Sequence, residues 1–125
     1  RLSFLIAGAS SEINARLVRR EDFQPYLEHV AEMDLQVYVQ ILKALAEHSA
    51  EHILPEIDVP TLIVAAEHDS FTPLSRSEEM HSAIKESELL VIPSGTHIGP
   101  IELPNLVNGA IEKFLKSRDL WPADK

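Results

Sequence analysis

Residues 59–73 read VPTLIVAAEHDSFTP, and residues 89–100 read LLVIPSGTHIGP. In the first stretch, TLIVAA (residues 61–66) is apolar after its first residue, which is typical of a strand buried on both faces of a parallel sheet. In the second stretch, LLVI (residues 89–92) predicts another short strand. A polar loop follows each apolar run. Together with the helices predicted around them, these two strands indicate an α/β fold.

The segments around these strands predict helices. Ser75 and Glu78 form the S-x-x-E pattern of a capping box, which indicates a helix between the two strands. After the second strand, apolar residues recur at helical spacing from Leu103 to Leu115, with Pro104 at the first helical position. The order strand, helix, strand, helix predicts a parallel β-α-β-α unit.

One acidic and one basic side chain follow the predicted strands. Asp69 comes three positions after the end of the first strand, and His97 comes five positions after the end of the second. Catalytic groups gather beyond the carboxyl ends of parallel strands, because helices cover both faces of the sheet. Neighbouring strands lie roughly 4.8 Å apart, so we expect these two side chains to meet. A carboxylate bonded to one imidazole nitrogen leaves the other nitrogen free to take a proton from a nucleophile.

These motifs resemble the α/β-hydrolase family, whose catalytic triad occurs in the order nucleophile, acid, histidine. VPTLIVAAEHDSFTP is similar to the family's strand and acid turn, and residues 92–115 (IPSGTHIGPIELPNLVNGAIEKFL) are similar to its last strand, histidine loop and final helix. The resemblance implies that Asp69 is the acid and His97 the base of a triad in a serine hydrolase. It also implies esterase-like activity on a small-molecule acyl substrate, with no cofactor.

The chain departs from this family at the nucleophile. The family nucleophile lies on a G-x-S-x-G elbow, and residues 8–12 (GASSE) lack the second glycine. We therefore identify no nucleophile here, and expect the chain to be the C-terminal part of a larger hydrolase and inactive alone. Two predicted strands would leave the flank of residues 61–66 uncovered, so we expect this edge to pair with a missing N-terminal half or with another copy.

The sequence divides into three parts. Residues 1–54 have a helical pattern and are predicted to be a cap segment, residues 55–117 to be the C-terminal part of the hydrolase core, and residues 118–125 to be a tail.

Within the cap segment, residues 2–7 are expected to be helical. Asp22 is predicted to cap a helix through Met33, and Asp34 to cap a second helix that continues until Pro55. We expect the apolar stripe of these two helices to be ordinary helix packing, with an acyl pocket as the alternative. The stripe consists of Phe23, Tyr26, Leu27, Val30, Met33 and Tyr38.

Other polar residues are weaker candidates for a metal site or for a role beside Asp69 and His97. Residues 48–52 (HSAEH) match H-x-x-E-H, in which two histidines on one helix face hold zinc. Histidines are common at a helix C-terminus and no third ligand is evident, so we predict no metal site; a zinc-dependent hydrolase using His48 and His52 is one alternative function. His68 is expected to be exposed or to support its neighbour Asp69. Ser70, Thr96 and Glu102 are candidates to support the histidine loop or the acid turn, with surface or capping roles as the alternative, and none of them is expected to be catalytic.

The composition excludes several classes of partner. The formal net charge of -9 argues against nucleic acid, and no apolar run is long enough to span a bilayer. With no cysteine, the chain has neither disulfides nor a thiolate site. The compartment stays open, with the cytoplasm favoured. The main alternative to an enzyme is a non-catalytic binding or assembly module that retains the second half of the fold.

Overall fold

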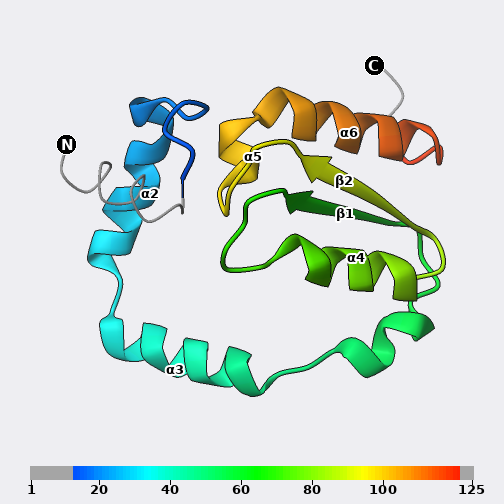
Figure 1. Cartoon of the computed structure of the whole chain (residues 1–125), viewed down its shortest axis with the longest axis horizontal. Coiled ribbons are helices and arrows are strands. Elements are labelled where there is room, and N and C mark those ends of the chain that lie inside the picture. Colours follow the sequence, from blue (N-terminus) through cyan, green and yellow to red (C-terminus); the bar gives the residue numbers. More distant parts are fainter. Residues whose placement is uncertain (1–12, 122–125) are drawn as a thin grey trace.

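The computed structural model describes residues 13–121, which form a small sheet flanked by helices and preceded by two further helices (Figure 1). The elements in chain order are α2 (Arg20–Glu32), α3 (Leu35–Glu47), the 3-10 helix η1 (Glu51–Glu56), β1 (Thr61–Ala66), α4 (Leu74–Ala83), β2 (Ser87–Ile92), α5 (Gly99–Glu102) and α6 (Pro104–Lys116). The helix expected over residues 2–7, the stretch at residues 8–12 and the last four residues of the predicted tail lie outside the described residues.

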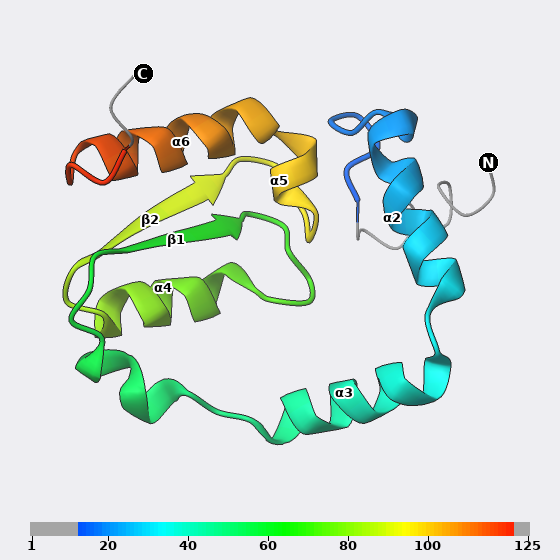
Figure 2. The ribbon, with the colours of Figure 1, turned by 180° about the vertical axis from the view of Figure 1, so that it is seen from behind.

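The sheet has the predicted parallel arrangement. β1 and β2 pair along their whole length, from Thr61 opposite Ser87 to Ala66 opposite Ile92. β1 has the predicted bounds, and β2 begins two residues before the predicted LLVI. The helix α4 lies against one face of the sheet and α6 against the other (Figures 1 and 2). The predicted α/β class and its β-α-β-α unit are therefore confirmed.

The core lies between the sheet and α6, where Ala66, Ile92 and Val107 are buried together. The loop after β2 packs directly onto these side chains because it contains two glycines. A Cβ atom at Gly95 would lie 2.7 Å from Cγ2 of Ile92, and one at Gly99 would lie 2.7 Å from its Cδ1. A side chain at Gly95 would therefore require the loop or the strand to shift, and one at Gly99 would require at least the end of the Ile92 side chain to move.

The predicted capping box of α4 is wrong. The helix begins at Leu74, its N-cap is Pro73, and no side chain caps it. Ser75 is therefore already inside the helix. The fixed φ of Pro73 (-54°) supplies the turn, and its carbonyl accepts the first hydrogen bond, from the N–H of Arg76 (2.9 Å). By contrast, α6 begins at Pro104 as predicted.

The two helices before the sheet differ from prediction at their ends. α2 begins at Arg20 rather than after Asp22, and Asp22 instead pairs with the guanidinium of Arg19 (2.8 Å). Asp34 caps α3 as predicted, accepting hydrogen bonds from the N–H groups of Gln36 and Val37. However, α3 ends at Glu47, well before Pro55, because the chain at His48 turns to an extended conformation.

The apolar stripe of α2 and α3 is mostly exposed in the described part of the chain. Phe23 is buried with Ile13, Val18 and Ile98, so ordinary packing explains that residue. Leu27 is partly buried against the same cluster, and the ring of Tyr26 stacks on Phe23. By contrast, α3 has no buried residue, and 71% of Leu35 is exposed. Figures 1 and 2 both show α3 standing apart from the sheet. The expectation of ordinary packing is therefore wrong for α3.

Candidate active site

Asp69 lies in the loop after β1, and its carboxylate organises that loop. Oδ1 accepts hydrogen bonds from the backbone N–H groups of Phe71 (2.8 Å) and Thr72 (2.9 Å), and Oδ2 accepts one from the hydroxyl of Thr72 (2.6 Å). An aspartate readily makes such bonds to the residues that follow it, which explains the tight turn leading into α4. The bonds hold the carboxylate in one orientation, with only 8% of the side chain exposed.

His97 lies in the loop after β2 and meets Asp69, as the sequence predicts. Its Nδ1 atom is 3.1 Å from Oδ2 and 3.2 Å from Oδ1 of the carboxylate. The ring also contacts Phe71, with the ring centroids 4.9 Å apart. The His97 side chain is 42% exposed, and its Nε2 atom makes no hydrogen bond to any described residue. The imidazole is thus held on one side and open on the other.

The surroundings of Asp69 favour its charged form. Burial alone would raise the pKa of this carboxyl group, but the hydrogen bonds from Thr72, His97 and Phe71 outweigh burial and hold the pKa below its ordinary value. Asp69 is therefore a carboxylate at neutral pH, as an acceptor for the Nδ1–H group of a histidine must be. A carboxylate in this position also stabilises the imidazolium that forms when Nε2 takes a proton.

The two loops are tied to each other at the ends of the strands. The N–H of His68 donates to the carbonyl of Gly95 (2.8 Å), and the carboxylate of Glu67 accepts from the N–H of Ser94 (2.7 Å). Ser94 has a left-handed backbone, with φ of 55°. These bonds lock the acid turn against the histidine loop. His68 takes part through its backbone, and its side chain is exposed, as expected.

Glu102 does not have the surface role that the sequence left as an alternative. It is 3% exposed, and both of its carboxylate oxygens accept hydrogen bonds from Thr96, which directly precedes His97. Thr72 and Phe71 were not expected at the site. The residue order Asp-x-Phe-Thr offers one signal for the turn, because an aspartate commonly binds N–H groups two and three residues later. Ser70 is exposed.

A small hollow of about 60 Å³ lies beside the acid and the histidine, among residues that include Asp69, Thr96 and His97. A larger hollow, of about 270 Å³, is lined by Tyr26, Val30, Met33, Leu35 and Tyr38 on α2 and α3. This second hollow corresponds to the apolar stripe that the sequence offered as an alternative acyl pocket.

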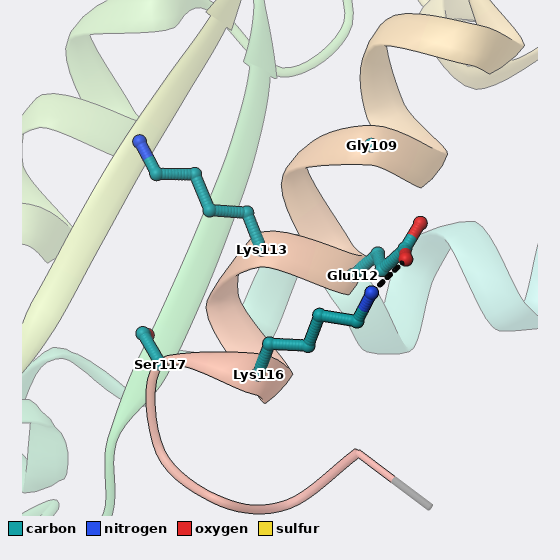
Figure 3. Close-up of a pocket in the computed structure, with 5 residues that line it drawn as sticks. All are labelled: Gly109, Glu112, Lys113, Lys116 and Ser117. Atoms are coloured by element: carbon teal, nitrogen blue, oxygen red, sulfur yellow. Dashed lines mark hydrogen bonds and ion pairs between the residues drawn. The ribbon is translucent and has the colours of Figure 1, made fainter. Parts of the chain in front are cut away.

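Another hollow lies away from this site, along α6. It measures about 520 Å³ and is lined by Gly109, Glu112, Lys113, Lys116 and Ser117 (Figure 3). Figure 3 shows Lys116 bonded to Glu112, whereas Lys113 points in another direction. The two ammonium groups do not converge on a common point, so the hollow offers no chemistry comparable to that of Asp69 and His97.

The H-x-x-E-H stretch does not have the geometry that a zinc site needs. His48 is the C-cap of α3, and His52 lies in η1, so the two histidines are not on one face of a single helix. Among residues 13–121, no group of three histidine, aspartate or glutamate side chains is placed to hold a metal ion. Within the same residues, none of the helices has the length and apolar composition that crossing a bilayer requires.

A family model described as "TAP-like protein" matches residues 41–124 of the chain. Among curated proteins, the chain is similar to 3-oxoadipate enol-lactonase 1 of Acinetobacter baylyi, with 30% identity over 94 residues, which are 75% of this chain and 35% of that protein. It is also similar to a pimeloyl-[acyl-carrier protein] methyl ester esterase of Neisseria meningitidis, with 36% identity over 62 residues, 50% of this chain and 24% of that protein.

The fold is similar to that of solved structures. The crystal structure of bromoperoxidase from Bacillus anthracis matches with a TM-score of 0.76 and 25% identity, covering 93% of this chain and 44% of that one. The chain thus spans less than half the length of each of these three proteins.

Proposed function

The chain belongs to the α/β-hydrolase fold family, and on this premise we propose that Asp69 and His97 are the acid and the general base of a hydrolase's catalytic triad. The observation that carries the proposal is the bond between Nδ1 of His97 and the buried Asp69 carboxylate, with Nε2 open. The nucleophile would come from outside the described residues.

In the proposed reaction, Nε2 of His97 takes the proton of a serine hydroxyl as its oxygen attacks the carbonyl carbon of the substrate. The imidazolium then gives that proton to the leaving group, whose bond to the carbonyl carbon breaks. Water then reacts in the same way: His97 takes its proton as the water oxygen attacks the acyl carbon. The bond to the serine oxygen breaks, the imidazolium returns the proton to that oxygen, and the acid is released. Throughout, Asp69 stays ionised and stabilises the imidazolium, consistent with its lowered pKa.

The substrate class that we propose is a small carboxylic ester, thioester or related acyl compound. The named activities of the relatives support this: one is a methyl ester esterase and another an enol-lactonase. The apolar hollow on α2 and α3 offers room for an acyl chain if residues 1–54 act as a cap over the site.

Labelling with a fluorophosphonate tests the proposal, because this reagent reacts with a serine that a histidine has activated. The complete hydrolase that carries this chain should be labelled, and His97→Ala should abolish labelling. His68→Ala is the matched control, since its side chain is exposed and its backbone bond is kept. Labelling that persists in His97→Ala would refute the assignment.

The second proposal, an assembly module, is favoured by the exposed apolar side chains of α3 and by the sheet of the described residues, where β1 pairs on one side only. The same features fit a chain whose sheet edge pairs with the rest of a larger protein. Labelling separates the two, because a module without catalysis would leave even the complete protein unlabelled.

A further inference from the structure

The carboxylate of Glu102 is buried beside the histidine loop and is surrounded by donors. Oε2 accepts a hydrogen bond from the N–H of Thr96 (2.7 Å), and Oε1 accepts bonds from the hydroxyl of Thr96 (2.7 Å) and the N–H of Asn14 (2.5 Å). A buried carboxylate is costly unless its oxygens are hydrogen-bonded. Within residues 13–121, three donors and no basic side chain fulfil this need, so the carboxylate acts as an acceptor for two backbone N–H groups and one hydroxyl.

The hydrogen bonds of Glu102 connect it to the residues directly before and after His97. Thr96 precedes the histidine, and Glu102 lies at the end of the short helix α5 that follows it. The carbonyl of Thr96 accepts a bond from the N–H of Gly99 (2.9 Å), and that of Ile98 accepts one from the N–H of Glu102 (3.1 Å). The backbone on both sides of His97 is therefore bonded to Glu102: to its carboxylate before the histidine and to its backbone N–H after it.

The segment before α2 is attached at the same place. The side-chain amide of Asn14 donates to the carbonyl of Ser94 (3.0 Å), while its backbone N–H donates to Glu102. Ile13 and Phe23 pack with Ile98, on the other side of His97. Glu102 thus joins two segments that are 88 positions apart in sequence.

We propose that Glu102 is a positioning residue for His97: it holds the loop so that Nδ1 faces Asp69 and Nε2 faces the open side. This inference rests on the proposed function of His97. No bond joins Glu102 to the imidazole itself in residues 13–121, so its effect passes through Thr96.

Glu102→Gln tests the proposal with little change in shape. The amide has one acceptor oxygen and one NH₂ group, so at least one of the donors around it faces another donor. In the complete hydrolase, we expect kcat to fall by about 10²-fold with KM nearly unchanged, because a small displacement of a catalytic group is costly. Glu112→Gln is the matched control, since that residue lies on α6 and pairs with Lys116 at the surface.

Nuclear magnetic resonance of the 125-residue chain provides a readout that does not need activity. In Glu102→Gln, the Nδ1 proton of His97 should exchange with water roughly tenfold faster. This is the change in rate expected when the free energy of about one hydrogen bond no longer protects the proton. Unchanged exchange together with a lower free energy of unfolding would show a merely structural role and overturn the proposal. If the complete protein proves inactive, the proposed function fails, and the exchange experiment still decides the role of Glu102.

If Glu102→Gln does not fold, Thr96→Val decides instead. It removes the hydroxyl donor to Oε1 and keeps the backbone bond to Oε2. Faster exchange of the His97 proton in Thr96→Val, restored in Thr96→Ser, would support the proposal. Exchange as slow as in the unchanged chain would contradict it.

Discussion

At the scale of single residues, the site depends on how many donors surround each carboxylate. Asp69 accepts from Phe71, Thr72 and His97, and it is almost completely buried. Such a group orients the imidazole only as long as it stays ionised, so the bonds within its own turn are as much a part of the site as the bond to the histidine.

The lowered pKa of Asp69 predicts how stability depends on pH. Because the folded-state pKa lies below the unfolded value of about 3.9, the bonds to the carboxylate stabilise the fold fully above that pH. This contribution is lost as the pH falls through the folded-state pKa. Asp69→Asn should therefore be less stable than the unchanged chain at neutral pH, with the difference shrinking in acid. Urea unfolding at a series of pH values measures this.

Asp58→Asn is the control, since Asp58 is exposed in the linker before β1. The difference in stability between Asp58→Asn and the unchanged chain should not shrink in acid as it does for Asp69→Asn. A difference between Asp69→Asn and the unchanged chain that stays constant down to strongly acid pH would contradict the account of the carboxylate.

The sequence was informative about some residues of the site and silent about others. Asp69 and His97 could be predicted because both follow apolar runs, and parallel strands place their carboxyl ends together. The contacts of Thr72 and Glu102 could not, because they depend on side-chain rotamers and on a turn at residues 93–96. A lone glutamate between apolar positions ordinarily faces solvent, and nothing in its spacing indicates that Thr96 and Asn14 surround it.

At the scale of elements, the close approach of the histidine loop to the strand ends fixes the site. A Cβ atom at Gly95 or Gly99 would lie 2.7 Å from the side chain of Ile92, which is buried and β-branched. The strands and α6 could be predicted from periodicity. The four-residue helix α5 could not, because it is shorter than the repeat on which a helical pattern depends.

A pair of glycine substitutions tests this packing. In Gly95→Ala, the new Cβ atom would lie 2.7 Å from Cγ2 of Ile92 and 3.3 Å from Cβ of Ala66, so the loop or the strand must shift. We expect a loss of about 1–3 kcal/mol in the free energy of unfolding. In Gly109→Ala on α6, nothing lies within 4 Å of the new atom.

Gly109→Ala should instead gain up to about 1 kcal/mol, because alanine favours the helix. Chemical denaturation of both variants measures the difference. If Gly95→Ala were as stable as the unchanged chain, the loop would not be packed on the strand ends as described.

At the scale of the whole molecule, two parts of the described chain differ in how they are packed. The sheet and α6 bury a shared core, whereas α3 exposes its apolar residues. The amphipathic pattern predicted a helix with an apolar face correctly. It could not predict whether anything covers that face, because periodicity reports which side chains share a face and not what lies opposite.

The uncovered apolar side chains predict self-association of the chain on its own. A second copy is the one partner available in a solution of the pure chain, and the exposed Leu35 and Leu42 lie on the same helix. We expect light scattering to show a mass above that of the monomer at high concentration. Leu42→Lys should shift the chain towards monomer, whereas Gln40→Lys, on the same exposed helix, should not. A monomer at every concentration would contradict this expectation.

The most direct test of the proposed function is the turnover number of Asp69→Asn in the complete protein. Without the carboxylate, Nδ1 of His97 loses its acceptor and the imidazole takes the wrong tautomer, which in a triad lowers kcat by roughly 10⁴-fold. We predict a loss of about that size, with Asp58→Asn unaffected. Turnover by Asp69→Asn equal to that of the unchanged protein would contradict the assignment of Asp69 and His97 as acid and base.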